Sequence, residues 1–584
     1  MRTKEKWIWL SVLCFLLPLA CSSSPDLRKV ASGAEVPESV KPSTGLKNPR
    51  TDPSAYYHYL LSQAKLREGK VDEAIEDLRK AVRFDPRDPF LRVELATLLY
   101  VHKRLLKEAL EECKAALKDD PNFLSAHLLM GQIYYHLKEN IRAIESYKKA
   151  IEIDPKHRDS YLYLSSLYAS LQQHEKAVET LEQLLKIEPS SLMALYSLGA
   201  IYREIKSYDK AAEYFSKALV LEPNQISILL DLAVTYELQN EVDKAMETYQ
   251  KVLALDPDNK RARNRLAQLL IRKKRLDEAL DQYRELQKED SADLDIRTKM
   301  GLIYLEQGKI DEAIAEFHFV LTANPRDERV KYYLAIAYVE KGALEQALSE
   351  FEKISPESEL FADSRRNIVL ILRKQKKTET ISQVLEKALK AKPDDPELYI
   401  LFSAHYEKEN QLDQAISIIQ KGLERNKNHP ELLFQLGALY DKLGDFDKMV
   451  FFMKEVLRIK PDHADALNYL GYSYADRGIH LQEALELIQK AMALKPNMGY
   501  ITDSLGWVYF KLGLYEKAVE ELEKANQLTP DDPTITEHLG DGYAKLSQSE
   551  KARELYEKAL KLDPKPDQAE RLRQKIREIE ERRR

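Results

Sequence analysis

The sequence has little cysteine, glycine and tryptophan: 584 residues include 3 Cys, 18 Gly and 3 Trp. So few cysteines exclude a disulfide scaffold, and so little glycine excludes a collagen-like chain. The formal net charge is only -6, and no segment combines a basic stripe with stacking aromatics, so nucleic-acid binding is not expected. Hydrophobic residues (44%) and charged residues (32%) are abundant instead. This composition excludes disorder and favours a helical, all-α fold.

Long apolar runs are also scarce, and the clearest one lies at the start of the chain. Residues 1–6 carry Arg2, Lys4 and Lys6, and residues 7–20, WIWLSVLCFLLPLA, carry no charge. A membrane-spanning helix needs roughly 20 apolar residues, so this run is too short to span comfortably. The pattern of a basic start, an apolar run and small residues predicts a signal peptide over residues 1–20.

The end of this run resembles the lipobox of bacterial lipoproteins, with Ala20 before the cleavage point and Cys21 as the lipidated residue. Pro18 and Leu19 depart from that motif, which leaves ordinary cleavage after Ser22 as the alternative. The resemblance implies several acyl chains on Cys21, enough for stable anchoring. Ser22, the residue after the lipidated cysteine, then resembles the sorting signal of a lipoprotein that is lipid-anchored in the bacterial outer membrane and faces the periplasm.

Residues 21–54 follow as the lipidated cysteine and a flexible tether. Residues 22–54 are rich in Ser, Pro, Gly and Lys and show no apolar periodicity. A flexible chain of this length has a root-mean-square extension of about 30 Å. The tether is therefore expected to hold the following body near the membrane.

A regular period of about 34 residues runs through the rest of the chain. An alanine that follows a charged residue, as in DEAIEDLRKAVRFDP at residues 72–86, recurs with this period, and two of the intervals are longer by a single residue. Isoleucine or methionine replaces it twice. Fifteen units result, over residues 55–566, and the marked positions are 74, 109, 143, 177, 211, 245, 279, 313, 347, 381, 415, 449, 484, 518 and 552.

Each unit resembles the tetratricopeptide repeat, a helix-turn-helix unit of about 34 residues. A small residue such as Gly131 or Gly506 stands before the marked position, an aromatic follows it by three residues, and a proline comes twelve residues after the marked position in twelve units. The resemblance implies an all-α solenoid of about 15 repeats in a right-handed superhelix. Each helix pair is expected to be stabilised by stacking on its neighbours.

The array is expected to fall into repeats 1–9 at residues 55–359 and repeats 10–15 at residues 360–566, followed by a capping helix at residues 567–584. Repeat 10 is irregular, because Val369 occupies the small position and Ile381 the marked one, and it follows the sequence ISPESE at 354–359. A bend or a looser joint over residues 355–380 is therefore our hypothesis.

The sequence contains no phosphate-binding loop, no HExxH, no GxSxG and no paired CxxC motif. We therefore expect no enzyme activity, no cofactor and no metal site. The segments on either side of the repeats, 1–54 and 567–584, are short, so an appended catalytic domain is not expected. Cys113 falls at an inward position that holds aromatics in other repeats, which indicates a core residue and not a reactive thiol.

In tetratricopeptide repeats the first helix of each unit lines a concave groove that binds protein or peptide segments. The groove positions lie three residues before, one after and four after the small residue. In the last three units they form an aromatic strip with an acidic rim that is suited to anchoring a partner. These candidate residues are Asn468, Tyr472, Asp503, Trp507, Phe510, Glu537 and Asp541.

The alternative for Trp507 is simple packing between neighbouring helices. Earlier units place fewer aromatic and charged residues on this face, namely Tyr59, Tyr135, Tyr196, Arg203 and Tyr332. The lysine and asparagine pattern of chaperone-binding repeats is missing, since Thr298 and Leu302 occupy comparable positions. A cytosolic cochaperone is therefore not expected.

Residues 466–525, with the phrases GYSYADRG and DSLGW, resemble the C-terminal portion of tetratricopeptide-repeat outer-membrane lipoproteins of Gram-negative bacteria. That family includes adaptors of a periplasmic carboxy-terminal processing protease. The resemblance implies a non-catalytic scaffold that delivers a protease or its substrates. The alternatives are an assembly scaffold for pilus, outer-membrane protein or exopolysaccharide export, and, more remotely, a repeat-bearing enzyme.

Overall fold

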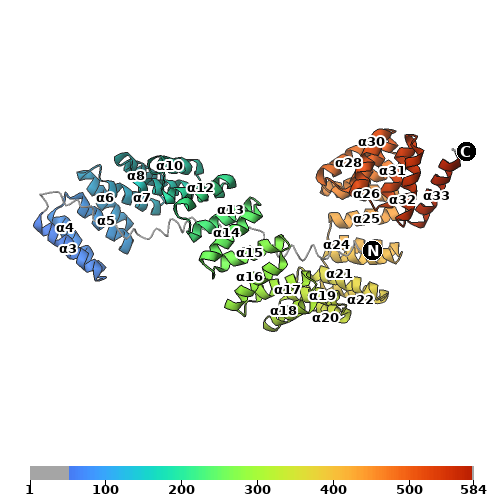
Figure 1. Cartoon of the computed structure of the whole chain (residues 1–584), viewed down its shortest axis with the longest axis horizontal. Coiled ribbons are helices and arrows are strands. Elements are labelled where there is room, and N and C mark those ends of the chain that lie inside the picture. The colour runs from blue at the N-terminus through green and yellow to red at the C-terminus, as the bar shows by residue number, and fades with distance from the viewer. Residues whose placement is uncertain (1–51, 582–584) are drawn as a thin grey trace. The chain divides into compact units, whose positions relative to one another are not determined.

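The computed structural model describes residues 52–581 (Figure 1). The predicted signal peptide, Cys21 and the tether up to residue 51 lie outside these residues. Throughout the described part of the chain, all regular secondary structure is helical. The described residues divide into two compact units, one up to residue 309 and one from residue 310, and the division falls between the two helices of repeat 8. The boundary expected at residues 359 and 360 stays a prediction.

The first unit contains seven complete helix pairs and the first helix of repeat 8. The first helices are α3 (Pro53–Arg67), α5 (Pro89–Lys103), α7 (Leu124–His136), α9 (Arg158–Ser170), α11 (Leu192–Glu204), α13 (Ile226–Leu238), α15 (Lys260–Arg272) and α17 (Leu294–Glu306). The second helices are α4 (Val71–Phe84), α6 (Leu106–Asp119), α8 (Asn140–Ile153), α10 (His174–Ile187), α12 (Tyr208–Leu221), α14 (Val242–Leu255) and α16 (Leu276–Glu289).

The second unit begins with α18 (Ile310–Ala323) and ends with α33 (Pro566–Glu581). The first helices of its repeats are α19 (Glu328–Lys341), α21 (Phe361–Lys374), α23 (Pro396–Lys408), α25 (Pro430–Lys442), α27 (Ala464–Arg477), α29 (Gly499–Lys511) and α31 (Pro533–Lys545). The second helices are α20 (Leu344–Glu352), α22 (Thr378–Ala391), α24 (Leu412–Arg425), α26 (Phe446–Ile459), α28 (Leu481–Leu494), α30 (Tyr515–Leu528) and α32 (Ser549–Lys561). The expected all-α solenoid of fifteen helix pairs is confirmed.

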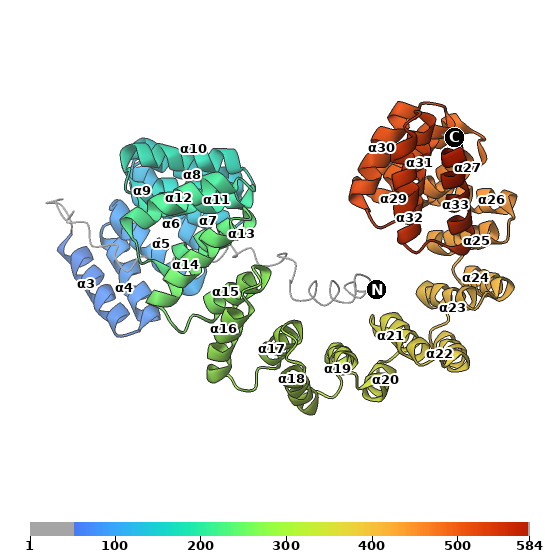
Figure 2. The ribbon, with the colours of Figure 1, turned by 45° about the vertical axis from the view of Figure 1, so that its right-hand side comes forward.

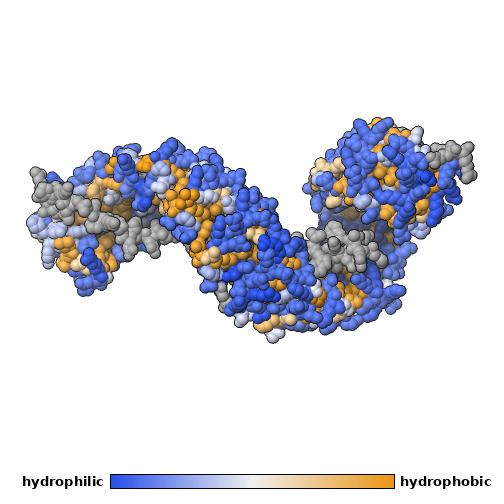
Figure 3. Space-filling view, in the orientation of Figure 1, coloured by the Kyte–Doolittle hydropathy of each residue, from blue (hydrophilic) through white to orange (hydrophobic). Residues whose placement is uncertain are grey.

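The repeating residues explain why each pair forms. All fifteen marked positions are buried, with exposures of 0 or 1%. At the small position the two helices of a pair come close together: an added Cβ on Gly131 would lie 2.4 Å from the Tyr147 ring, and one on Gly506 would lie 2.6 Å from Leu522. A side chain at either glycine therefore requires the facing side chain or the helices to shift. Apolar residues accordingly lie in seams between polar helix surfaces (Figure 3).

Side chains and turns set the helix boundaries. The carboxylates of Asp88 and Asp532, for example, accept hydrogen bonds from main-chain amides at the start of α5 and α31, as N-caps do. Most turns inside a pair contain one residue at positive φ, such as Lys138 or Asn240. The helix ends therefore recur at fixed places in each unit.

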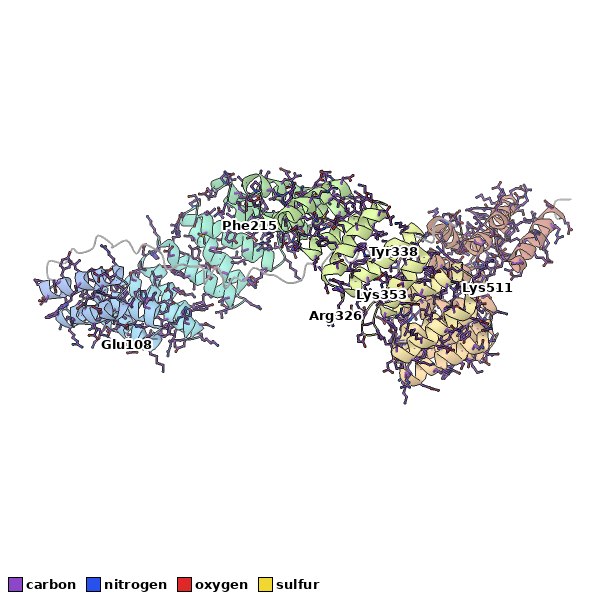
Figure 4. The ribbon with its side chains drawn as sticks, turned by 90° about the horizontal axis from the view of Figure 1, so that it is seen from below. Glu108, Phe215, Arg326, Tyr338, Lys353 and Lys511 are labelled. Atoms are coloured by element: carbon purple, nitrogen blue, oxygen red, sulfur yellow. The ribbon has the colours of Figure 1, made fainter. Side chains whose placement is uncertain are left out.

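Repeats 9 and 10 depart from the common pattern, as their sequence suggests. Helix α20 has 9 residues and is shorter than the other second helices. The following segment is nevertheless held by hydrogen bonds: Arg365 donates to the carbonyl oxygens of Phe351 (2.9 Å) and Ile354 (3.0 Å), and the Ser355 amide donates to Glu328 (3.0 Å). Figure 4 labels Lys353, the residue that follows α20.

Candidate functional site

The seven candidate residues lie on α27, α29 and α31, the first helices of repeats 13, 14 and 15 (Figure 2). The C-terminal helix α33 continues their register. Its residues Gln568, Arg571 and Lys575 follow Thr534, Glu537 and Asp541, in that order, by one repeat length. Helix α33 therefore matches the first helix of a sixteenth repeat and places its cations opposite the predicted acidic rim.

Asp503 forms a buried pair with a histidine that the sequence analysis did not select. His538 Nδ1 lies 3.0 and 3.1 Å from the two carboxylate oxygens of Asp503, and the exposures of the two residues are 7 and 6%. Burial disfavours the charged imidazolium, but the Asp503 carboxylate outweighs this effect and raises the pKa of His538. The only sequence signal for His538 was that it follows the groove position Asp503 by 35 residues, about one repeat length.

Trp507 packs between neighbouring helices and is only 8% exposed. Its ring stacks on His538 at a centroid distance of 4.0 Å and on Phe510 at 4.8 Å. Its Nε1 donates to Asp476 Oδ1 at 3.3 Å, and the Lys511 ammonium lies 5.0 Å from its centroid. Lys511 is labelled in Figure 4. Trp507 is thus buried in packing contacts and its part in binding stays a prediction, while Phe510 is partly exposed.

Glu537 and Asp541 are both paired with the C-terminal helix. Glu537 is 4% exposed and accepts hydrogen bonds from Gln568 and Lys575, each at 2.8 Å. Lys575 also donates to both Asp541 oxygens, at 2.7 and 2.8 Å. Burial opposes ionisation of Glu537, but Lys575 lowers its pKa overall. The acidic rim at repeat 15 is therefore occupied within the chain.

Asn468 and Tyr472 lie one helical turn apart on α27. Asn468 is 8% exposed, and its Oδ1 is buried without a hydrogen-bond partner among residues 52–581. Tyr472 is partly exposed, and its ring centroid lies 6.4 Å from that of His538. Burial raises the pKa of Tyr472, and the carboxylates of Asp476, Asp503 and Glu537 raise it further. The electrostatic potential at the Tyr472 hydroxyl is therefore negative.

The earlier groove positions form separate polar contacts. Tyr196 and Arg203 both donate to the Asp231 carboxylate, at 2.8 and 2.7 Å, which joins α11 to α13. The Tyr332 hydroxyl accepts a hydrogen bond from Asn367 at 3.0 Å. These contacts connect one repeat to the next and leave these polar groups satisfied.

Two further searches cover residues 52–581. No group of three or more His, Cys, Asp or Glu side chains there has the arrangement of a metal site. No helix among them combines the length and the apolar character that a membrane span requires. Cys113 is fully buried, as expected, and burial raises the pKa of its thiol to about 12.

Sequence models of the tetratricopeptide repeat match residues 55–88, 239–303, 304–360 and 368–572. The model described as the C-terminal ARM domain of tetratricopeptide repeat protein 21 matches residues 85–268. None of these models indicates a catalytic family. No curated protein matches the chain.

Several solved structures match parts of the chain. Residues 41 to the end of MamA from Desulfovibrio magneticus RS-1 are 25% identical, and the match covers 29% of this chain and 94% of that one, with a TM-score of 0.26. Yeast Tom70 is 18% identical, with coverage of 79 and 96% and a TM-score of 0.36. YrrB, described as a TPR protein with an unusual peptide-binding site, is 21% identical, with coverage of 34 and 97% and a TM-score of 0.28.

Proposed function

We propose that this tetratricopeptide-repeat chain is a non-catalytic adaptor, held by a lipid on Cys21 at the periplasmic side of a bacterial outer membrane. Its partner is a processing protease together with the substrates of that protease. A scaffold for protein–protein interaction is the function that the repeat fold supports in general. The protease, the lipid and the location are the finer parts of the proposal, and they rest on the sequence resemblance.

One observation carries the choice of the C-terminal repeats. The two phrases that carry the resemblance to the lipoprotein family, GYSYADRG at residues 471–478 and DSLGW at residues 503–507, lie on α27 with its C-cap and on the adjacent helix α29. They meet where Trp507 Nε1 donates to Asp476. The phrases thus fix the relative position of the two helices that carry Tyr472 and Phe510.

This arrangement supports binding by a preformed surface. Phe510 and Tyr472 are partly exposed aromatics on helices whose contacts are already made, so few side chains need ordering when a partner binds. Rigid aromatic groups with polar neighbours are common anchors of protein segments. The tether at residues 21–54 would let this surface reach partners near the membrane.

The test is chemical crosslinking and purification of the lipidated protein from bacterial membranes. We expect a PDZ-containing protease to co-purify, and we expect Phe510→Ala to reduce its recovery. Phe451→Ala is the matched control, because Phe451 is a 59% exposed phenylalanine on a second helix, α26. Cys21→Ser should release the protein from the outer-membrane fraction.

The contrary outcomes are distinct. Purification without any protease, together with unchanged levels of cell-wall hydrolases in a deletion strain, would contradict the adaptor role. Recovery of a membrane partner and a secretion defect in the deletion strain would instead support the assembly scaffold. Equal recovery by the Phe510→Ala and Phe451→Ala variants would place the binding surface elsewhere.

A further inference from the structure

The first described helix, α3, carries apolar residues on two opposite faces. It packs on α4, and its inward residues Ala55 and Ser62 are fully buried. Tyr57, Leu60 and Ala64 follow one another at intervals of three and four residues, so they lie together on the other face of the helix. All three are exposed, Tyr57 by 61% and Leu60 by 48%. Helix α3 therefore presents a second apolar stripe that α4 does not cover.

In the following repeats, the same positions are buried against the preceding repeat. Tyr57 lies five residues before Ser62, the small residue of repeat 1, and Ala64 lies two residues after it. In repeats 2 to 5 these two positions have exposures of 0 to 8% and hold Leu91, Leu98, Ala126, Ile133, Ser160, Leu167, Ala194 and Ile201. In repeat 15 an added Cβ on Gly542, at the second of these positions, would lie 2.8 Å from Val519 on α30. The stripe on α3 is thus an inter-repeat surface.

The two ends of the described repeats differ in character. Among residues 52–581 no helix precedes α3, which lies at the end of the first unit (Figure 1), so its inter-repeat surface stays exposed. Helix α33, at the other end, exposes the polar and charged residues Glu570, Arg573, Gln574 and Arg577. A polar outer face is what an end repeat needs for solubility. Only the C-terminal end of the described residues is therefore closed in this way.

This difference restricts what covers the stripe on α3. The charged outer face of α33 does not match an apolar stripe, so head-to-tail stacking of copies is not favoured. A second α3 offers an identical apolar stripe, and joining the two continues the apolar packing that already connects each repeat to the next. Such a contact uses the same patch on both copies, so it closes as a two-fold dimer and does not propagate into a filament.

Charge and side-chain size determine the direction of such a helix pair. Asp52 is the N-cap of α3, and Arg67 extends the exposed stripe at its C-terminal end. Antiparallel helices place Arg67 of one copy near Asp52 of the other and oppose the two helix dipoles, whereas parallel helices bring like charges together. With Leu60 at the centre, Tyr57 of one copy then lies opposite Ala64 of the other, so a large side chain meets a small one.

We propose that two copies of this chain associate through α3, as an antiparallel helix pair centred on Leu60. The pair joins the apolar cores of the two N-terminal repeats. Helix α3 has 15 residues and is about 22 Å long, so the contact is smaller than the roughly 800 Å² per partner of a standard interface. The expected dissociation constant is therefore on the order of tens of micromolar.

Sedimentation equilibrium tests the association. It uses the full chain with Cys14→Ser and Cys21→Ser, so that neither a lipid nor these thiols contribute. We expect a monomer–dimer equilibrium between about 1 and 200 µM. Leu60→Lys places two ammonium groups at the centre of the pair and should raise the dissociation constant at least about tenfold. The matched control is Ile141→Lys, because Ile141 is a 74% exposed aliphatic residue on α8 of the same unit.

Both lysine variants replace exposed side chains, so their thermal unfolding midpoints should equal that of the unchanged protein. This separates loss of association from loss of folding.

Disulfide formation tests the antiparallel direction in the same background. Tyr57→Cys and Ala64→Cys are purified separately, then oxidised alone or mixed. In the antiparallel pair, position 57 of one copy faces position 64 of the other, so the mixture should form disulfide-linked dimers. Two copies of position 57 are about 10 Å apart along the helices, beyond the roughly 7 Å that a disulfide allows between Cα atoms. Each variant alone should therefore form few, and Cys113 is buried and does not compete.

Three results would overturn the inference: a monomer at every concentration, equal association of the Leu60→Lys and Ile141→Lys variants, or equal disulfide formation by single and mixed cysteine variants. A monomer would mean that the stripe is covered by residues 1–51, by lipid or by another protein. None of these results bears on the adaptor role, because that role is judged by the proteins crosslinked in membranes.

Discussion

Arg365 provides the most direct test of how repeats 9 and 10 are held together. It is 9% exposed, and its guanidinium donates to the carbonyl oxygens of Phe351 and Ile354 at 2.9 and 3.0 Å. It also lies 4.3 Å from the centroid of the Phe361 ring. Burial lowers the pKa of this guanidinium. Carbonyl dipoles at the end of the short helix α20 therefore take the place of a carboxylate partner.

Arg365→Ala removes both hydrogen bonds and leaves two carbonyl oxygens without this donor. A hydrogen bond to a charged group contributes about 1.5–3 kcal/mol, and the cost of burying the guanidinium offsets part of this. We expect a net local loss of about 2–4 kcal/mol. Amide hydrogen exchange in α20 and α21 should then become about 30- to 1,000-fold faster, because each 1.4 kcal/mol is tenfold in an opening equilibrium.

Arg366→Ala is the matched control on the same helix. Arg366 is exposed and paired with Asp363 and Glu397, and such surface pairs contribute about 0–1 kcal/mol. Equal exchange rates in the two variants would refute the role assigned to Arg365. In the unchanged protein, exchange over residues 355–380 no faster than in repeats 3 to 6 would remove the hypothesis of a looser joint there.

Three further predictions follow from buried groups. Gly540→Ala should lower the thermal unfolding midpoint measured by circular dichroism, by about 1–3 kcal/mol of stability, because its Cβ would lie 2.5 Å from the Tyr556 ring; an unchanged midpoint would contradict the close approach. Because the pKa of His538 is raised in the folded protein, its charged form stabilises the fold fully below about pH 6.5, and this stabilisation is lost as pH rises through the raised pKa. The loss of unfolding free energy caused by His538→Gln, measured by denaturant titration, should therefore shrink with increasing pH. A loss that grows with pH would contradict the charged pair with Asp503. Cys113 should resist thiol reagents at pH 8 until the protein unfolds, since its pKa is about 12; rapid labelling of the native chain would contradict its burial.

The fold was largely predictable because each unit repeats the same packing problem. The marked alanines, the glycines at the close approach and the inward aromatics recur with the period of the repeat, so one solution serves every unit. Tyr147, for example, lies at the inward position that Cys113 holds in its own repeat, and it fills the space that the absent side chain of Gly131 leaves. Because each repeat is stabilised by contacts with the adjacent repeats, residues at the same position of the period have the same packing role, and the sequence alone identifies them.

The candidate surface was less predictable, because it depends on which side chains of different repeats meet. The spacing rule selected Asp503 and Trp507, but it did not select His538, which contacts both of them. The same rule selected Glu537 without showing that Lys575 already neutralises it. These contacts join side chains about one repeat apart in the sequence, and their outcome depends on side-chain length and direction.

By itself, the sequence determined the repeat, the number of helix pairs and which positions of each helix are buried, since period and residue size are local properties of the chain. It also showed that known catalytic motifs are missing from the sequence. Only the tertiary structure decided which groove residues remain available. Helix α33 pairs with Glu537 and Asp541, Trp507 is held between helices, and Asn468 keeps an oxygen without a donor among the residues that the structure describes. The physical reason is that a polar group buried between two helices is satisfied or unsatisfied according to its neighbours in space.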